Sequence, residues 1–299
     1  AFDPALVSYD SAYENALMNS PSYRRYTVDV IERLLSACRV EGGTVVEIGC
    51  GRGEFLRMLC ERGTRRAIGF DPGRPGETAT VGDATFEIID AAFDAATAPP
   101  APDLVCSRHV LEHLPSPVSL LRAVAAAYAA SDRAVLFLEV PNGLHIAEQL
   151  CIWDLMYAHV SYFLPTSLSC ALRAAGIAAA RIETAFGGQF LVAEAPLGRS
   201  VAEGPRGDPM PDTARLFQSL QTGFARTADT WGEWLRAARQ SGRRLALWGA
   251  GAKGATFLNL LDRSDPPAVG LAIDINPHKW GTFIPGTGHP IPAPSDSIG

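Results

Sequence analysis

The sequence predicts an α/β protein in which a domain with a parallel, doubly wound sheet is followed by a second, smaller α/β domain. Short apolar runs of the kind that form buried strands alternate with helical patterns along most of the chain. Two of these runs, at 45–48 and 245–248, end in glycine-rich turns, and each turn is followed by an apolar pattern with helical spacing. The length of 299 residues suits about two domains.

The composition is that of a globular protein, with 47% hydrophobic and 19% charged residues. The formal net charge of -6 and the lack of a long basic run argue against nucleic-acid binding, which depends on clustered Lys and Arg. None of the six cysteines lies in a CxxC pair, so we expect reduced thiols in a cytoplasmic protein. No apolar stretch reaches the ~18 residues that a membrane span needs, and the first residues do not resemble a signal peptide. We therefore expect neither nucleic acid nor a membrane as a partner.

The first domain is expected at 36–195, after an N-terminal helical or lid segment at 1–35. A helix begins in that segment and runs to about residue 40, with Thr27 as a plausible N-cap. The strands expected in the domain are 44–49, 66–73, 87–94 with its exit loop, a strand that begins near 102, 134–142, and two strands around the Gly187–Gly188 turn.

A change of composition then separates the two domains. Residues 196–212 are rich in Gly, Pro and charge, which is typical of a linker. A long amphipathic helix over about 213–239 follows, and a second strand–turn–helix unit begins at 244. We expect the second domain at 213–299.

The first glycine turn is an E-x-G-x-G-x-G sequence between a buried strand and a helix. The expected ligand-contacting residues of this turn are Glu47, Gly49, Cys50, Gly51 and Gly53. Glycines permit a tight turn and let a ligand approach the backbone closely. The next strand ends at Asp71, where a carboxylate can accept hydrogen bonds from a ribose. This spacing resembles the first motif and the ribose-binding acid of class I S-adenosylmethionine (SAM) methyltransferases, which implies SAM as the cofactor.

Further candidates follow the later strands. The resemblance places an acid or amide near the adenine, and Asp90 is the candidate for it, with Asp83 as the alternative. His109, Glu112 and His113 are expected at the mouth of the cofactor and substrate pocket, with His109 at the cofactor and His113 at the substrate side. The competing interpretation is a helix start in which His109 and Glu112 make local capping bonds. We expect no metal site, because no further His or Cys pairing supports one.

The stretch WDLMYAHVSYF, at 153–163, follows a buried strand at the carboxyl edge of the expected sheet, where ligands bind in doubly wound folds. His159 lies among aromatic residues and is a candidate general base, because an imidazole titrates near neutral pH. A buried histidine in an aromatic cluster is the alternative.

Several segments together resemble the sugar C-methyltransferase family of deoxysugar biosynthesis. They are EIGCGRGEFL, HVLEHL, EVPN, YAHVSYF, WGAGAKG and IDINPHKWGTFIPGTGHPI, and the resemblance covers nearly the whole chain from Tyr9 onward. It implies SAM-dependent methylation of a ring carbon beside the ketone of a nucleotide-linked deoxysugar. It also implies His159 as the base, with Tyr157 assisting near the ketone or enolate oxygen. The expected substrate-binding residues in the first domain are His113, Asn142 and Tyr162.

The sequence departs from that family in three ways. The family usually has Glu directly before the catalytic His, where this chain has Ala158, which points to weakened base catalysis, a different substrate or an engineered change. The cysteine-rich zinc domain with which the family usually begins is not found. The sequence stops after PAPSDSIG, where the family continues with a further strand and helix, so the second domain is expected to be incomplete.

The second glycine turn is a GxGxxG at Gly249, Gly251 and Gly254, and Asp274 closes the next strand. On spacing alone this is a dinucleotide fingerprint, and it supports a rival interpretation as a nicotinamide-dependent oxidoreductase. Lys253 inside the turn is unusual for a dinucleotide loop. The resemblance implies instead a Rossmann-like accessory domain whose cations contact the phosphates of the nucleotide-sugar, namely Lys253, His278 and Lys279. A scaffold that only shapes the cleft is the alternative.

Other functions stay open at this stage. A SAM-dependent methyltransferase for another small molecule would share the same cofactor loop, and a SAM-binding protein with impaired catalysis would fit Ala158. Tyr9 and Tyr13, ahead of the first helix, are expected either to form a lid over the cofactor or to take part in ordinary packing.

Overall fold

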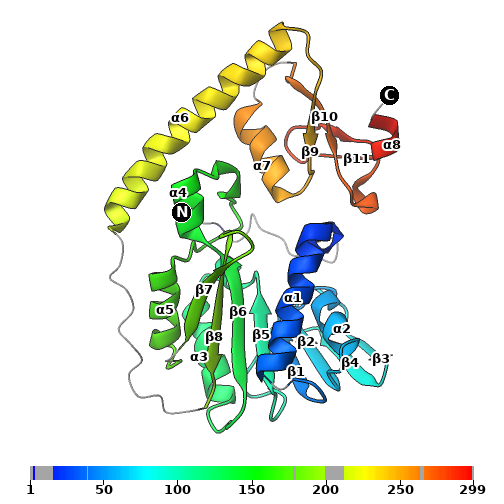
Figure 1. Cartoon of the computed structure of the whole chain (residues 1–299), viewed down its shortest axis with the longest axis vertical. Coiled ribbons are helices and arrows are strands. Elements are labelled where there is room, and N and C mark those ends of the chain that lie inside the picture. Colours follow the sequence, from blue (N-terminus) through cyan, green and yellow to red (C-terminus); the bar gives the residue numbers. More distant parts are fainter. Residues whose placement is uncertain are drawn as a thin grey trace. The chain divides into compact units, whose positions relative to one another are not determined.

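The structure is a computed structural model, which describes residues 3, 16–38, 40–177, 180–198, 212–262 and 266–297 (Figure 1). These residues divide into two compact units. The first holds 22–144 and 158–198, and the second holds 16–21, 145–157 and 212–297. The units thus differ from the continuous ranges expected from the sequence, because the short segment 145–157 joins the second unit. Tyr9, Tyr13 and most of the expected linker lie outside the described residues.

The first unit is built on an eight-stranded sheet in the order β3-β4-β2-β1-β5-β6-β8-β7. Its five central strands are parallel to one another: β4 (Ala84–Ile89), β2 (Arg66–Phe70), β1 (Thr44–Ile48), β5 (Leu104–Arg108) and β6 (Val135–Pro141). The outer strands are antiparallel to their neighbours: β3 (Glu77–Val81), β8 (Phe190–Pro196) and β7 (Arg181–Ala185). Strand order therefore reverses between β1 and β5, which is the position where doubly wound sheets bind ligands.

Helices cover both faces of this sheet. The helical elements of the first unit are α1 (Pro21–Cys38), α2 (Glu54–Cys60), η3 (Leu111–His113), α3 (Pro117–Ala127) and α5 (Pro165–Ala174). Two short elements, η2 (Ala16–Asn19) and η4 (Ile152–Asp154), and most of α4 (Gly143–Gln149) belong to the second unit. The expected start of the first helix is wrong, because α1 begins at Pro21 and Thr27 is buried inside it. Proline suits the first turn of a helix, since its fixed φ matches and its missing N–H would have no intrahelical partner.

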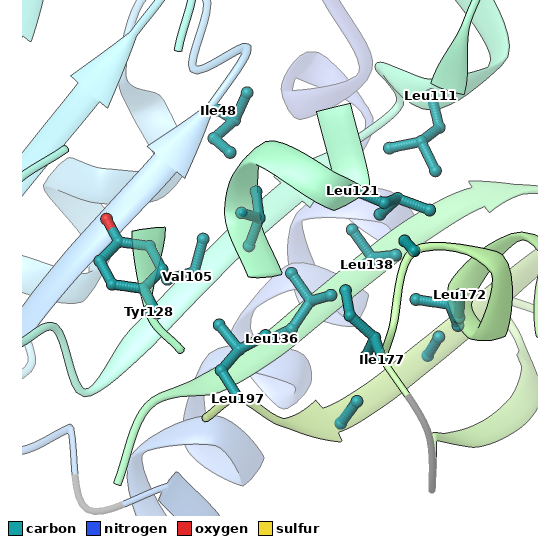
Figure 2. Close-up of a cluster of buried hydrophobic side chains, with 14 of the residues drawn as sticks. Ile48, Val105, Leu111, Leu121, Tyr128, Leu136, Leu138, Leu172, Ile177 and Leu197 are labelled. Atoms are coloured by element: carbon teal, nitrogen blue, oxygen red, sulfur yellow. The ribbon is translucent and has the colours of Figure 1, made fainter. Parts of the chain in front are cut away.

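The main core lies between the sheet and the helices α3 and α5 (Figure 2). Leu136 and Leu138 of β6 point to the same face because side chains alternate along a strand. They gather with Leu121 of α3 and Leu172 of α5, all at most 1% exposed. Burial of such a side chain contributes about 1.5–3 kcal/mol each.

The opposite face of the sheet carries polar side chains near its carboxyl edge. Alternation places Glu47, Arg108 and Glu139 on this face, and Arg108 pairs directly with Glu139 across β5 and β6. Helix α1, blue in Figure 1, packs on this face, where the guanidinium of Arg33 stacks on the ring of Phe137. The face of the sheet under α1 thus has an apolar part and, nearer the carboxyl ends of the strands, a charged part.

The second unit contains one strand–helix–strand repeat and a long helix. Its elements from residue 212 onward are α6 (Thr213–Gln240), β9 (Leu245–Trp248), α7 (Ala252–Leu261), β10 (Val269–Ile273), η5 (Pro277–Lys279), β11 (Thr282–Phe283), β12 (Pro290–Ile291) and α8 (Pro294–Ser297). Strands β9 and β10 are parallel, and β11 and β12 are antiparallel. Asp212 caps α6 by accepting the N–H of Arg215 at 3.0 Å. None of the helices in the described ranges combines the length and the hydropathy that a membrane span requires.

Candidate active site

The first glycine turn follows β1 at the point where strand order reverses. Gly49, Gly51 and Gly53 have φ angles of 73°, 55° and 69°, which favour glycine. A Cβ atom would clash with Val110 at Gly49 and with Phe86 at Gly53, but at Gly51 it would meet nothing within 4 Å. The turn is therefore packed at both ends and open in the middle, where a ligand can approach the backbone.

Asp71 supports this turn from the end of β2. Its Oδ2 accepts the N–H of Gly51 at 2.8 Å, and its Oδ1 accepts the N–H of Gly73 at 2.9 Å. Cys50 is turned inward, and burial raises the pKa of its thiol, so it is a packing residue rather than a nucleophile. A carboxylate oxygen can accept more than one hydrogen bond, so ribose binding by Asp71 is compatible with these contacts and stays a prediction.

The two candidates for the adenine side lie at opposite ends of β4. Asp90 directly follows β4, at the same carboxyl edge as Asp71, and its side chain is exposed. Asp83 precedes β4, in the turn from β3. Only Asp90 is therefore at the edge of the sheet where the glycine turn lies.

The surroundings of Glu47 show whether a cationic cofactor fits beside the first glycine turn. Its side chain is buried and, within the described residues, its Oε2 has no hydrogen-bond partner. Burial raises the pKa of this carboxyl to about 8, against the opposing influence of Arg108. A buried carboxylate without a partner is costly. The ammonium group of a SAM molecule would relieve that cost, so the residues around the turn fit the cofactor that the sequence implies.

A buried charged cluster on the α1 side of the sheet consists of Tyr23, Tyr26, Arg108, His109 and Glu139. Arg108 contacts Glu139 at 2.8 Å and donates to the hydroxyl of Tyr23 at 2.9 Å, and the hydroxyl of Tyr26 donates to the other oxygen of Glu139. Burial alone would raise the pKa of Glu139, but Arg108 and His109 outweigh it and hold the pKa at about 2. Glu139 is therefore ionised at any physiological pH.

His109, the first residue after β5, lies between two acids. Its φ angle is 55°, an uncommon value for a residue with a side chain. Its Nε2 is 3.0 Å from Glu139 and its Nδ1 is 3.6 Å from Glu112. Burial alone would lower the pKa of His109, but the two carboxylates raise it to about 9. His109 is thus a cation at neutral pH, and cofactor binding by it stays a prediction.

The candidate base lies in a second cluster, made of Glu112, His113 and His159. One ligand-type atom from each side chain lies within 4.8 Å of the others. The rings of His113 and His159 meet edge to face, with centroids 4.9 Å apart. Burial lowers the pKa of His159 to about 4, although Glu112 opposes this. His159 is therefore neutral at pH 7 and has a nitrogen able to accept a proton.

Backbone bonds fix the loop that carries His159. The N–H groups of Val160 and Ser161 both donate to the carbonyl of Glu112, at 2.7 and 3.1 Å. His113 Nδ1 lies 3.0 Å from the carbonyl oxygen of Ala158, which can only accept, so Nδ1 is the protonated nitrogen. The HVLEHL segment and the His159 loop are joined at three points.

The other expected residues of this region have varied surroundings. Tyr162 has its ring 5.8 Å from that of His159 and is 36% exposed. Asn142 is buried, and its amide donates to the carbonyl of Gly188 and accepts the N–H of Leu144, so it positions the exit of β6. Tyr157 is half-exposed and ends the segment that belongs to the second unit.

The acid and the two lysines near the second glycine turn take part in ion pairs. Asp274 accepts the N–H of Ala250 at 2.7 Å and pairs with Lys279 at 3.1 Å. The ammonium group of Lys279 also donates to the carbonyl of Ala250. Lys253 pairs with buried Asp154 at 2.9 Å. His278 is exposed. These lysines thus bind acids of their own unit, and phosphate binding by the three cations stays a prediction.

Sequence reasoning did not select Tyr23, Tyr26, Arg108 and Glu139, which hold His109. The sequence places Glu112 at the pocket mouth with the two histidines, or in a local capping bond, and does not indicate that it lies beside His159. A signal was present, because a Glu inside the otherwise apolar strand VLFLEVP must be buried and needs a partner. The partner could not be named, since Tyr26 lies 113 positions away.

Comparisons with known proteins agree with this geometry. The family of methyltransferase domains matches residues 21–180, and the family of C-methyltransferase C-terminal domains matches residues 210–298. No curated protein matches the sequence significantly.

Several solved structures are similar to part of this chain. A SAM-dependent methyltransferase from Archaeoglobus fulgidus has 21% identity and a TM-score of 0.42, over 61% of this chain and 99% of that one. Magnesium protoporphyrin IX methyltransferase (ChlM) from Synechocystis PCC 6803, with bound SAM, has 18% identity and a TM-score of 0.40, over 62% and 86%. The DhpI complex with S-adenosylhomocysteine has 17% identity and a TM-score of 0.43, over 66% and 94%.

The match to the methyltransferase domain covers more than half of the 299 residues, and it contains the whole glycine turn, Asp71 and both histidine clusters. The sheet order and the position of the turn are those of a class I Rossmann-like methyltransferase domain. The chain therefore belongs to the methyltransferase domain family, and it is a methyltransferase that uses SAM as its cofactor.

Proposed function

We propose that this methyltransferase transfers a methyl group to a carbon atom beside the ketone of a nucleotide-linked deoxysugar. The match of residues 210–298 to C-methyltransferase C-terminal domains supports carbon as the acceptor. The observation that carries the mechanism is that the imidazole of His159 is neutral and partly buried. His159 lies on a loop after the last parallel strand, and backbone hydrogen bonds hold this loop.

The roles of the residues follow from their chemistry. A hydrogen on a carbon beside a ketone is weakly acidic, and a positioned neutral imidazole can remove it and leave an enolate. His159 holds the proton after that step. Tyr157 is assigned to the ketone oxygen as a hydrogen-bond donor. SAM, when bound, supplies the electrophilic methyl group that the carbon takes up.

The substrate-side assignments complete the proposal. His113, Asn142 and Tyr162 of the first unit are assigned to the sugar side of the site, and Lys253, His278 and Lys279 of the second unit to its phosphates. Cations suit phosphate groups. The match to a C-methyltransferase C-terminal domain supports a substrate role for the second unit over a nicotinamide site.

The test separates cofactor binding from proton removal. Calorimetric titration should give SAM binding and no heat with NAD. A nucleotide-linked keto-deoxysugar incubated in D2O should exchange the hydrogen beside its ketone, and should gain a methyl group when SAM is added. His159→Gln should keep SAM affinity and lose both exchange and methylation by about 100-fold or more. NAD binding without SAM binding, or full activity of His159→Gln, would overturn the proposal.

A further inference from the structure

Glu112 is a buried acid that the proposed reaction leaves without a role. Its side chain is 1% exposed, and among the described residues neither carboxylate oxygen has a hydrogen-bond partner. Leaving a buried acceptor unpaired is expensive, and more so when it is charged. The imidazole of His109 lies 3.6 Å from one carboxylate oxygen of Glu112, so the carboxylate can still accept a hydrogen bond from a further donor.

His159 has the complementary defect. Its Nδ1 atom is buried and, in the described part of the chain, has no hydrogen-bond partner. A carboxylate oxygen of Glu112 lies within 4.8 Å of a ring nitrogen of His159, so the two side chains are neighbours inside the same buried cluster. A hydrogen bond from the N–H of His159 Nδ1 to a carboxylate oxygen of Glu112 would give a partner to both buried groups.

We propose that Glu112 is the positioning residue of His159: its carboxylate accepts the N–H of Nδ1 and directs Nε2 toward the substrate. For its role in catalysis the proposal rests on the proposed function. The neighbouring groups support the choice of Glu112. His113 has its Nδ1 directed to the carbonyl of Ala158, and the Nδ1 of His109 lies 3.6 Å from Glu112.

The backbone keeps these two side chains in register. Val160 and Ser161, directly after His159, both donate to the carbonyl of Glu112 itself. The atoms that must meet are therefore attached to backbone segments already bonded to one another. A carboxylate that orients an imidazole in this way also stabilises the imidazolium that forms when the base takes up a proton.

The position of Glu112 gives a physical meaning to Ala158. In the resembled family a Glu usually stands directly before the catalytic His, and here that position has no acidic side chain. Glu112 brings a carboxylate to the same imidazole from another segment, 47 positions earlier in the chain (Glu112 to His159).

A divalent metal ion is the competing occupant, because two imidazoles and a carboxylate are also a metal-ligand set. Charge argues against it. His109 is held as a cation by Glu112 and Glu139, and it already lies beside the carboxylate that the metal would need. His159 also cannot act as a base while its lone pair binds a metal, so the two arrangements predict different behaviour.

The first measurement is the protonation of His159 by nitrogen NMR of the labelled full chain, without substrate. The wild type should show Nδ1 protonated and Nε2 unprotonated at neutral pH. Glu112→Leu removes the acceptor and should give a mixture of tautomers. Glu112→Gln retains an acceptor without charge, so it should keep the tautomer but lower the imidazole pKa. The titratable groups that act on the ring of His159 are Glu112, His113 and His109, and both of these histidines are retained in the Glu112 variants.

The second measurement is turnover with the keto-deoxysugar. Glu112→Gln should lower kcat by roughly tenfold to a hundredfold, shift the acidic limb of the pH profile of kcat, and change KM little. Glu112→Asp, which retains the charge, should recover part of the rate. Glu183→Gln, an exposed carboxyl on β7, is the matched control and should behave as the wild type. Melting temperatures identify any variant that does not fold. If Glu112→Gln does not fold, the rate of Glu112→Asp is compared with the wild type instead.

The outcomes separate the two proposals. If His159→Gln is inactive while Glu112→Gln has the wild-type tautomer, pH profile and kcat, the positioning role is wrong and the proposed function stands. If His159→Gln is fully active, the proposed function itself is wrong. The NMR result alone then shows whether Glu112 accepts a hydrogen bond from His159. Loss of activity on treatment with EDTA, with recovery on adding Zn²⁺ or Mn²⁺, would overturn the positioning role in favour of a metal site.

Discussion

The Nδ1 atom of His113 lies 3.0 Å from the carbonyl oxygen of Ala158, so a side chain of the HVLEHL segment holds the residue directly before the candidate base. The carbonyl of Glu112 accepts two further N–H groups from Val160 and Ser161 on the other side of His159. The loop is thereby held before and after the base. This arrangement lets a loop residue act with the precision that catalysis requires.

The hydrogen bond of His113 can be tested with two amides of different length. The amide nitrogen of Asn lies near the position of Nδ1, whereas that of Gln lies near Nε2. His113→Asn should therefore keep the bond to Ala158, and His113→Gln should lose it. We expect amide hydrogen exchange in a peptide covering 158–161 to rise about tenfold or more in His113→Gln and to change little in His113→Asn. Equal exchange in both variants would show that the bond does not hold the loop.

The opening at Gly51 predicts a loss of SAM affinity when any side chain is added. Gly51→Ala places a methyl group where the backbone must meet the ligand, so we expect SAM affinity to fall by about tenfold or more in calorimetry. Gly82→Ala is the matched control. Gly82 has a φ angle of 59° against 55° for Gly51, and a Cβ there also meets nothing within 4 Å.

Both variants carry a similar backbone strain, on the order of 1 kcal/mol. Any difference in SAM affinity between them therefore reports the ligand rather than the fold. If Gly51→Ala and Gly82→Ala bind SAM equally well, the cofactor does not approach this turn.

The parts of the site that could be predicted are those set by strand ends. In a doubly wound sheet the carboxyl ends of parallel strands share one edge, so residues after each strand are near one another whatever the loops do. Gly49, Asp71, Asp90, His109 and Asn142 follow five such strands, and the structure places all of them at that edge.

The parts that could not be predicted depend on contacts between distant segments. Tyr26 and Glu139 are 113 positions apart, and a tyrosine in an amphipathic helix gives no sign of its partner. Strand β3 was not expected either, because its sequence ETATV lies exposed at the edge of the sheet and has no apolar side chain pattern.

Glu47 should make the protein without cofactor less stable as pH rises. Its pKa is raised from 4.5 to about 8, so the folded state favours the protonated form. That contribution to stability is complete below about pH 4.5 and is lost as pH rises through 8. Glu47→Gln removes it, and we expect the variant to be more stable than the wild type by more than about 1 kcal/mol at pH 8.5, since one pKa unit is worth ~1.4 kcal/mol.

The same variant should bind SAM more weakly, because it lacks the carboxylate that we expect to face the ammonium group of the cofactor. Urea unfolding at pH 5 and pH 8.5, together with SAM titration, measures both effects. A variant that is less stable than the wild type at pH 8.5, or that binds SAM with unchanged affinity, would contradict the role given to Glu47.

The charged cluster around Glu139 should have its largest stabilising effect in a limited pH range. The pKa of Glu139 is lowered from 4.5 to about 2, so its contribution is complete above pH 4.5 and is lost as pH falls through 2. The pKa of His109 is raised from 6.5 to about 9, so its contribution is complete below pH 6.5 and is lost as pH rises through 9. The two windows overlap between about pH 4.5 and 6.5.

Glu139→Gln tests this expectation, because it leaves Arg108 and His109 buried without their shared partner. Removal of one member of a buried ion pair costs about 3–5 kcal/mol, so we expect a loss of that size in urea unfolding at pH 6 and a smaller loss at pH 9.5. Glu194→Gln is the control. Glu194 lies on β8 of the same sheet and pairs with the partly exposed Arg33 of α1. A more exposed pair is worth about 0–1 kcal/mol, so its loss should be several times smaller and nearly independent of pH over this range. If the two substitutions cost the same at pH 6, the cluster does not stabilise the fold through its charges, and His109 must be held in place by packing against Phe190.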